Sequence, residues 1–441
     1  MFRKLFLLAL ILSTPATQAE DLMDIYQQAL ISDPELRAAE YGYRAVSTSL
    51  DQADAAYRPT IQFNSSWSYV SQDSKPSNVI SPTDEGDITD YTLSLKQPIF
   101  NYNALVLKKQ ADINTTRAET EFYSTQQSVM LKTAERYFAY LFAQSALEFA
   151  RSEKAAIAKQ LEQANKRFEV GLIAITDVHE AQAAYDLSVA SEITALNLLD
   201  SASEALTEIT GKPHNNLERV SKKLPLIRPD PESMTAWTDI ALKQNLQLKT
   251  LELQTQIAKQ EIRLRKADHY PSLSLFANHN FNDNNIRAQE STRDAVGIEL
   301  NVPIYEGGLT SARVQEAAYL YSQSQENLEQ LKRSVLRQAR DAYRGVINGI
   351  GQVQALDQAT ISNTSALETT QAGFEVGTRT IVDVLIAQRG LFGARRDYDQ
   401  ARHRYIINIL RLKLAAGTLS QEDLQYFNSW LVDTDEPNTD F

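Results

Sequence analysis

Cysteine is absent from the 441 residues of this chain. Its absence excludes disulfide bonds, thiolate metal sites and an acyl anchor on an N-terminal cysteine. Methionine is scarce as well, with four residues, and no two histidines are spaced by four residues to hold a metal ion. The histidines are His179, His214, His269, His279 and His403. We therefore expect no metal site and no bound cofactor.

A phosphate-binding loop is also missing. Gly211, Lys212 and Pro213 come nearest to one, but the glycine run and the Ser or Thr after the lysine are absent. The sequence therefore predicts no ATPase and no catalytic residues. Any energy for its activity has to come from a partner protein.

Positive charge is in deficit, with 44 Lys and Arg against 56 Asp and Glu and a formal net charge of −12. Nucleic-acid binding requires a basic surface, so that class of function is excluded. Long apolar runs are missing beyond the N-terminal segment, which argues against a membrane-spanning helix. In lipid, a closed β-barrel is the other fold that satisfies every backbone polar group.

The N-terminal segment is typical of a secretory signal peptide. Arg3 and Lys4 precede the apolar run 5–12, and small residues lead to a predicted cleavage after Ala19, so that the signal spans 1–19. A short N-terminal anchor is the alternative. Cleavage removes two basic residues and no acidic ones, which lowers the formal net charge from −12 to −14.

The sequence repeats itself at an offset of 206 residues. The segment RFEVGLIAITDVHEAQA (167–183) returns as GFEVGTRTIVDVLIAQR (373–389), and LSLKQPIF (93–100) resembles IELNVPIY (298–305). A repeat of this length indicates duplication of a half-molecule, so we expect two-fold internal pseudosymmetry. Each half is predicted to contain a helix, two strands, a very long helix, a reversal and a return helix.

The predicted long helices span 101–170 and 311–376, since neither contains proline. The first also lacks glycine, and 70 helical residues extend about 105 Å. Gly345, Gly349 and Gly351 predict a bend or close packing in the second.

Each long helix is predicted to reverse at a Val-Gly pair. Gly171 and Gly377 suit the left-handed conformation common at helix C-termini. The return helices are predicted at 178–209 and 383–415. Asp177 with Glu180, and Thr380 with Asp383, have the spacing of capping boxes at their starts.

Four strands are predicted from alternation of apolar and polar residues, at about 60–70, 91–99, 272–281 and 295–303. The polar segments 71–90 and 282–295 are predicted hairpin loops. Trp67, Tyr69 and Tyr91 are candidates for an aromatic girdle at a membrane surface. Two amphipathic hairpins packed on a soluble core are the alternative. Four strands cannot close a membrane barrel, so copies of the chain would have to pool their strands.

The predicted domain organisation follows the repeat. The first repeat spans 20–211 and the second 234–420, with a proline-rich inter-repeat linker at 212–233. The C-terminal tail is 421–441, and from Asp433 it is acidic and predicted to be disordered.

Five segments in order carry a family resemblance. They are EDLMDIYQQALISDPELRAAE (20–40), RFEVGLIAITDV (167–178), VPIYEGGL (302–309), VGTRTIVDVL (376–385) and RYIINILRLKLAAGTLS (404–420). Together they resemble the TolC family, the outer membrane factors of Gram-negative bacteria. The resemblance implies an α+β membrane protein. It is a homotrimer in which four strands per protomer build one 12-stranded β-barrel, continued by a long periplasmic α-helical barrel.

The resemblance also implies a function. Such a trimer is the outer-membrane exit duct of tripartite efflux pumps and type I secretion systems, for drugs, detergents or secreted proteins. Its partners are a periplasmic adaptor (a membrane fusion protein), an inner-membrane pump or ABC transporter, and outer-membrane lipid. A non-pore periplasmic coiled-coil scaffold and a channel restricted to one cargo, such as metal ions, are the alternatives.

By resemblance, the gate lies where the helical hairpins reverse. Thr176 and Asp177 match hydrogen-bond acceptors on the first hairpin, Arg379 matches the donor on the second, and Asp383 matches a carboxylate that projects into the pore. In a trimer, three copies of Asp383 would favour cations. Asp383 and Asp177 could also simply cap helices.

Two gate positions depart from the family pattern. Ile386 stands where a second aspartate is common, which predicts weaker cation binding and an apolar constriction. Phe374 stands where a tyrosine often donates a hydrogen bond. We therefore expect the closed state to depend more on Arg379 and on packing.

The adaptor is expected to dock at the hairpin ends. The docking residues implied by the resemblance are Val170, Gly171, Leu172, Val376, Gly377 and Thr378. Glycine permits close approach of another backbone. The alternative is that both glycines only terminate helices.

Overall fold

The structure is a computed structural model that describes residues 19–72, 84–214, 216–221, 223–286 and 289–432. The described chain forms two compact units, and both halves of the repeat contribute to each. The first unit contains the described residues of Met1–Arg37, Thr125–Asn245 and Val335–Phe441. The second contains those of Ala38–Ser124 and Leu246–Ser334. The predicted tail from Asp433 lies outside the described residues.

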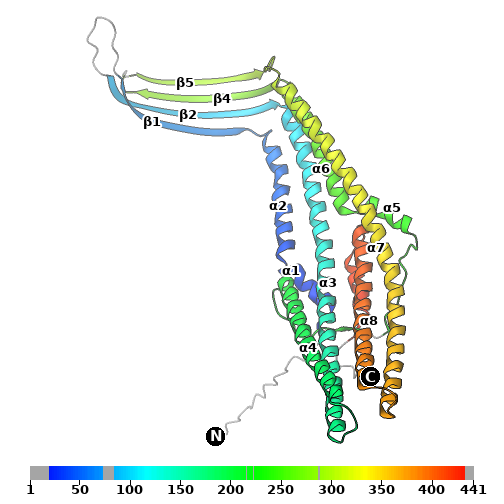
Figure 1. Ribbon diagram of the computed structural model, residues 1–441. Helices are drawn as coiled ribbons and strands as arrows, with labels where there is room; N and C mark the ends of the chain where they lie inside the picture. The colour runs from blue at the N-terminus through cyan, green and yellow to red at the C-terminus, as the bar shows by residue number, and fades with distance from the viewer. Residues whose placement is uncertain (1–18, 73–83, 215, 222, 287–288, 433–441) are drawn as a thin grey trace, which may run out of the picture. The chain divides into compact units, whose positions relative to one another are not determined.

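The second unit joins a sheet to four helical segments (Figure 1). The strands are β1 (Thr60–Gln72), β2 (Asp84–Phe100), β4 (Ser272–Asn284) and β5 (Gln289–Asn301). They pair antiparallel in the order β1-β2-β4-β5. The helical segments come from α2 (Pro34–Ala55), α6 (Leu246–Ala267) and the first parts of α3 (Tyr102–Glu169) and α7 (Leu309–Glu375). The central β2–β4 pair unites the two halves of the repeat.

The strands are longer than the sequence predicted. β2 begins at Asp84 and β5 at Gln289, so the predicted loops are wrong over 84–90 and 289–295, which are strand. The part 73–83 of the first predicted loop lies outside the described residues. The physical reason is the polar face of the sheet. A strand with one polar face carries Asp, Thr, Asn and Ser at alternate positions, which gives it the composition of a loop.

The two faces of the sheet differ in character. One face carries exposed apolar side chains, such as Trp67 and Val296, which are 67% and 78% exposed. A row of rings crosses it, with Tyr91 stacked on Phe63 at 6.3 Å and on Phe281 at 5.8 Å. The opposite face is polar. The described sheet therefore leaves its apolar face uncovered in the single chain.

The polar face is held by contacts between strands. Lys96 forms an ion pair of 3.3 Å with Glu299, which also accepts a hydrogen bond from Ser274. Gly297 lies on this face under the ring of Phe276, where a Cβ atom would come within 2.8 Å of the ring. A larger residue at 297 would displace that ring.

The first unit contains segments of four long helices, α3, α4, α7 and α8, and α4 contacts both α3 and α8 (Figure 1). α4 is Ile175–Thr210 and α8 is Ile381–Ala416. Glu192 of α4 pairs with Lys154 of α3, and Glu135 of α3 pairs with Arg411 of α8. α8 meets α7 where Asn408 donates a hydrogen bond to the Gly345 carbonyl at 3.0 Å.

Short elements complete the first unit. They are α1 (Leu22–Ser32), α5 (Met234–Gln244), α9 (Gln421–Asn428) and a two-stranded sheet of β3 (Arg219–Val220) with β6 (Leu431–Val432). They surround a core that includes Tyr26, Tyr137, Phe138 and Tyr405. Buried tyrosine hydroxyls fix the linker there, since Tyr137 donates to the Glu218 carbonyl and Tyr405 to the Ile227 carbonyl, both at 2.8 Å.

The glycines of α7 fit the predicted close packing at two of three positions. A Cβ atom at Gly345 would lie 3.5 Å from Asn408, and one at Gly349 would lie 3.6 Å from Tyr405. Gly351 faces open space. Close helix packing therefore accounts for the first two glycines and not for the third.

Within the described residues, the structure contains no helix that combines the length and the apolar character needed to cross a membrane.

Candidate functional site: the ends of the helical hairpins

Each helical hairpin of the first unit reverses through a short turn. α3 ends at Glu169 and α4 begins at Ile175, while α7 ends at Glu375 and α8 begins at Ile381. Gly171 and Gly377 have φ angles of 74° and 81°. This left-handed conformation is strained for other residues and closes the helix end through backbone hydrogen bonds. Such a bond joins Leu172 N to the Arg167 carbonyl at 2.9 Å.

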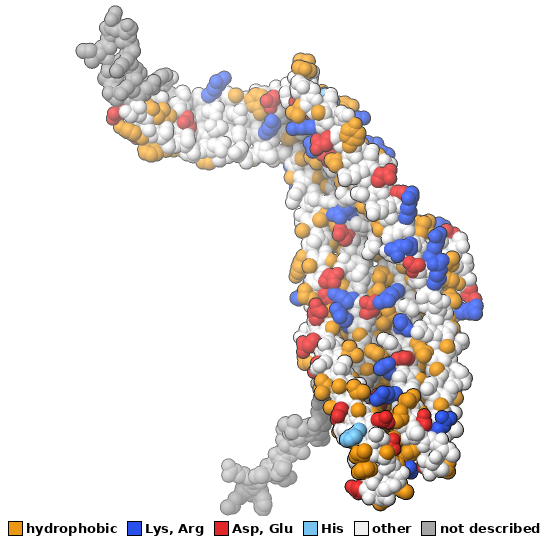
Figure 2. Space-filling model, in the orientation of Figure 1, with side chains coloured by type: hydrophobic (Ala, Val, Ile, Leu, Met, Phe, Trp, Pro, Cys, Tyr) orange, Lys and Arg blue, Asp and Glu red, His pale blue; other side chains and the backbone are white. Residues whose placement is uncertain are grey.

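The predicted docking residues are all exposed at these turns. Val170, Leu172 and Val376 are 69%, 72% and 75% exposed, so apolar side chains project from both turns. Figure 2 shows hydrophobic side chains at the surface of this end. A Cβ atom on Gly171 or Gly377 would meet open space. Both glycines are therefore needed for the turn, and a role in docking stays a prediction.

Asp383 caps α8 as the sequence predicted. Its carboxylate accepts hydrogen bonds of 2.9 Å from the backbone N–H and the hydroxyl of Thr380. In return, Asp383 N donates to the Thr380 hydroxyl at 3.3 Å. The hydrogen bond from the Thr380 backbone is the largest influence, and it lowers the pKa of Asp383 below its ordinary value. Asp383 therefore combines a capping role at the start of α8 with a carboxylate that favours its charged form.

The corresponding prediction for the first hairpin is wrong. α4 is preceded by Ala174, which makes no side-chain capping bond, and Asp177 lies inside the first turn. The reason is that α4 begins earlier than the sequence indicated, so Asp177 and Glu180 are both helical. In the first turn of α4, the negative charge of Asp177 still interacts favourably with the helix dipole.

Arg379 lies directly before α8 and is exposed. Its stem packs over Gly373, where a Cβ atom would come within 2.8 Å of the Arg379 Cγ atom. In the described part of the chain, no recorded hydrogen bond or ion pair joins Arg379 to Thr176 or Asp177. The link implied for the closed gate stays a prediction.

Phe374 packs inside the hairpin ends rather than facing solvent. It is 8% exposed and belongs to a small core that draws on all four long helices. The Arg167 guanidinium lies 4.3 Å from the centre of its ring. Cation–π contacts of this kind are stabilising. Arg167 was not predicted from the sequence, although its place in the repeated segment beside Phe168 is a usable signal.

Ile386 is 61% exposed on α8, one turn beyond Asp383. An isoleucine this exposed contributes nothing to the core of the single chain. Single exposed apolar side chains are common on protein surfaces, so a role of Ile386 in a constriction stays a prediction.

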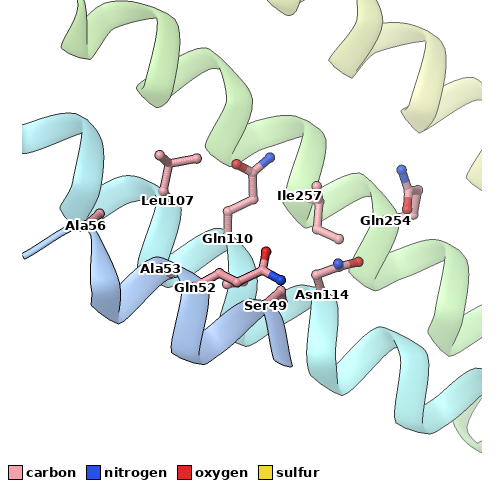
Figure 3. A pocket seen from close by; sticks show the side chains of 10 residues that line it. Ser49, Gln52, Ala53, Ala56, Leu107, Gln110, Asn114, Gln254 and Ile257 are labelled. Atoms are coloured by element: carbon pink, nitrogen blue, oxygen red, sulfur yellow. The ribbon is translucent and has the colours of Figure 1, made fainter. Parts of the chain in front are cut away.

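A separate groove of about 460 Å³ lies in the second unit. Figure 3 shows its lining side chains coming from α2, α3 and α6. They include Gln52, Gln110, Asn114 and Gln254, together with small apolar residues. Amides without a paired acid and base do not form a catalytic constellation.

Comparison with known proteins shows which family the chain resembles. The outer membrane efflux protein family model matches residues 25–212 and 237–418, on either side of the linker. The chain is 38% identical over 423 residues to the outer membrane protein TolC of Vibrio cholerae, covering 94% of this chain and 95% of that protein. It is 29% identical over 427 residues to the alkaline protease secretion protein AprF of Pseudomonas aeruginosa, covering 94% and 88% of the two chains.

Among solved structures, the fold resembles the CmeC outer membrane channel of Campylobacter jejuni. The TM-score is 0.79 at 16% identity, and the match covers 94% of this chain and 90% of that one.

Proposed function

The chain belongs to the outer membrane efflux protein family, and on that premise we propose that it is the exit duct of tripartite efflux pumps and type I secretion systems. It is an outer-membrane channel protein and not an enzyme. Three copies conduct cargo passively from an inner-membrane pump to the outside. A gate at the hairpin ends opens when a periplasmic adaptor docks.

The observation that carries this proposal is the full-length match to relatives of both kinds. Relatives named for protease secretion and a relative named for efflux each align over at least 94% of this chain. The duct, rather than a cargo-binding site, is the feature that both kinds of system would share. Cargo choice then belongs to the pump.

The sheet supports a pooled barrel. β1 and β5 are the edges of the four-stranded sheet, and among the described residues each leaves one side unpaired. Unpaired edges favour pairing with another chain. Three copies give twelve strands and leave no edge, with the exposed apolar face turned to lipid.

The gate is assembled between copies. Among the described residues, no hydrogen bond or ion pair joins Arg379 to Asp177 within one chain, which supports a link to a neighbouring chain in the closed state. Thr176, the second acceptor, is exposed beside Asp177. Asp383 supplies one carboxylate per copy, so that the ring at the constriction carries three.

The adaptor is proposed to seat on the two turns. Each turn offers exposed valine beside a glycine that has no side chain to block a second backbone. An apolar helical end would bury these valines. The two turns are related by the repeat, so one trimer offers two related kinds of docking groove.

Conductance in a planar bilayer tests the proposal. The purified wild-type protein should give small, cation-selective currents, because the gate is closed and acidic. Arg379→Ser should raise single-channel conductance by breaking the link. Arg333→Ser, which removes an arginine from α7 in the second unit, is the control and should leave conductance unchanged.

Two results would count against it. Equal conductance of wild type and Arg379→Ser would remove the gate role of Arg379. A folded, membrane-extracted protein that never forms pores would overturn the duct and favour a scaffold.

A further inference from the structure

A second pocket, with a volume of about 180 Å³, lies in the first unit, where the linker, α5, the end of α8 and α9 meet. Its α8 residues include Ile409 and Leu412, at the opposite end of that helix from the gate residues. An apolar cavity of about 150 Å³ takes one benzene molecule. The pocket therefore has room for a group of that size, and neither the gate nor the docking turns account for it.

Aromatic side chains form much of the wall. Trp237, Phe427 and Trp430 are buried, and Tyr426 is exposed. The ring centre of Trp430 lies 4.8 Å from that of Phe427 and 5.2 Å from that of Tyr426, with the rings steeply inclined to one another. Trp237 Nε1 donates a hydrogen bond to the Pro231 carbonyl at 2.9 Å, so this polar atom is satisfied within the protein. The pocket is therefore lined by rings whose faces carry partial negative charge.

The charged side chains around the pocket are unequally satisfied. Arg228 pairs with Glu232 at 3.2 Å, and Lys413 pairs with Asp423. Asp230 also lines the pocket and is exposed. In the described part of the chain, its carboxylate has no recorded hydrogen bond or ion pair. An anionic ligand would have to displace a carboxylate from Arg228 or Lys413, whereas a cation meets a carboxylate without such a partner.

We propose that this pocket binds a small organic cation, with its ammonium group beside Asp230 and its apolar part against the tryptophan rings. Ammonium groups are attracted to the faces of Trp and Tyr, and alkylated ammonium ions are recognised in this way. The apolar part is limited by the volume to about one aromatic ring. The inference goes beyond the proposed duct, since binding here can be measured whether or not the protein conducts.

Tryptophan fluorescence gives a direct measurement. The chain has three tryptophans, and Trp67 lies on β1 in the second unit. The variant Trp67→Phe therefore leaves only Trp237 and Trp430, both of which line the pocket. Benzyltrimethylammonium chloride, added to this variant in a non-ionic detergent, should change the fluorescence and reach saturation.

Matched probes separate charge from size. Benzyl alcohol and sodium phenylacetate carry the same ring with no charge and with a negative charge. The proposal predicts that both bind at least about fivefold more weakly than the cation, since they lose the attraction to a carboxylate at an exposed site. High salt should weaken binding of the cation and leave that of benzyl alcohol unchanged.

Variants in the Trp67→Phe background test the assigned residues. Asp230→Asn should weaken cation binding by about fivefold and leave benzyl alcohol binding unchanged. Tyr426→Ala should weaken cation binding by about threefold, because it removes one ring from the wall. Asp239→Asn is the control, since Asp239 is an exposed carboxylate on α5 that does not line the pocket.

Thermal unfolding gives an independent measurement. A ligand that binds the folded chain raises its unfolding temperature. Benzyltrimethylammonium should therefore stabilise the wild-type protein and Asp239→Asn more than it stabilises Asp230→Asn. Because Asp230 is exposed, the unfolding temperatures of the three proteins should agree without the cation.

The outcomes decide the assignment. Saturable binding that prefers the cation and is weakened by Asp230→Asn but not by Asp239→Asn supports it. Equal binding of the three probes would make the pocket a neutral apolar cavity, and a fluorescence change that never saturates would indicate collision only. A preference for the cation that Asp230→Asn leaves intact would also contradict the proposal. Each of these results leaves the duct standing, because conductance tests it separately.

Discussion

His403 shows how burial can dominate the protonation of a residue. It lies on α8, where its ring centre is 5.8 Å from that of Phe138. Burial is the largest influence and lowers its pKa, Asp399 opposes that effect, and Arg402 adds to it. In the folded chain His403 is therefore neutral at pH values where a free histidine begins to bind a proton.

We predict that His403 makes the first unit sensitive to acid. Its folded pKa lies below its unfolded value of about 6.5, so the unfolded chain binds the proton first. The contribution of His403 to the free energy of unfolding is fully present above that value. It falls by about 1.4 kcal/mol per pH unit as the pH drops toward the folded pKa. Thermal unfolding measured at several pH values should show this slope.

His403→Gln should flatten that slope, because glutamine does not titrate. His269→Gln, at a histidine that is exposed in the folded chain, is the control and should leave the slope unchanged. If wild type and His403→Gln lose stability equally as pH falls, other groups cause the effect. The sequence could not single out His403 among five scattered histidines, because burial arises from helices distant in the chain.

Asp383 and Asp177 also show what the sequence alone could not predict. Both occupy the same position in the repeat, yet only Asp383 completes a capping box. The sequence revealed the spacing in both hairpins. It did not reveal that α4 begins one turn early, because Ile175 and Thr176 are compatible with either a helix or a turn.

At the scale of the element, the reversal at Gly377 combines a backbone requirement with an open surface. Asparagine tolerates the left-handed conformation, whereas tryptophan both strains it and fills the space above it. We predict that Gly377→Asn keeps efflux and that Gly377→Trp abolishes it while the trimer stays intact. Growth of cells in the presence of a toxic cargo measures this. Normal resistance with Gly377→Trp would leave the glycine with only its helix-ending role.

The strands allow a comparison of the two faces of one element. Ile298 and Glu299 are neighbours on β5 and point to opposite faces of the sheet. An arginine on a lipid-facing position costs about 2–4 kcal/mol at the bilayer midplane. We therefore expect Ile298→Arg to reduce trimer in the membrane fraction, and Glu299→Arg to be tolerated. Equal amounts of both variants would contradict a lipid contact for the apolar face.

Element types were predictable to different degrees. The long helices were visible because 68 residues of α3 contain no breaker. Close packing was visible at Gly345 and Gly349. The strand ends were not, because residues such as Asp87 and Asp90 have loop-like composition and extend the ladder only through their partners on β1 and β4.

At the scale of the whole molecule, charge is distributed unevenly along the proposed duct. The sequence carries a net charge of −12, yet α8 contains seven Lys and Arg against three Asp. Asp383 is the one acidic residue in the first turn of α8, and Ile386 follows it three residues later. Ion selectivity should therefore depend on a single ring of three carboxylates.

Reversal potentials under a salt gradient measure that dependence. Asp383→Asn should shift the reversal potential toward zero, and Ile386→Asp should shift it toward the value of a purely cation-selective pore. Asp397→Asn, farther along α8 and paired with Arg396, is the control and should change little.

The Thr380 hydrogen bond lowers the Asp383 pKa within one chain, and the like charges of the ring act in the opposite direction. Wild-type selectivity should therefore fall only at acidic pH, as the ring takes up protons, and Asp383→Asn should show no such fall. Selectivity that is unchanged by Asp383→Asn would place the constriction elsewhere in the duct.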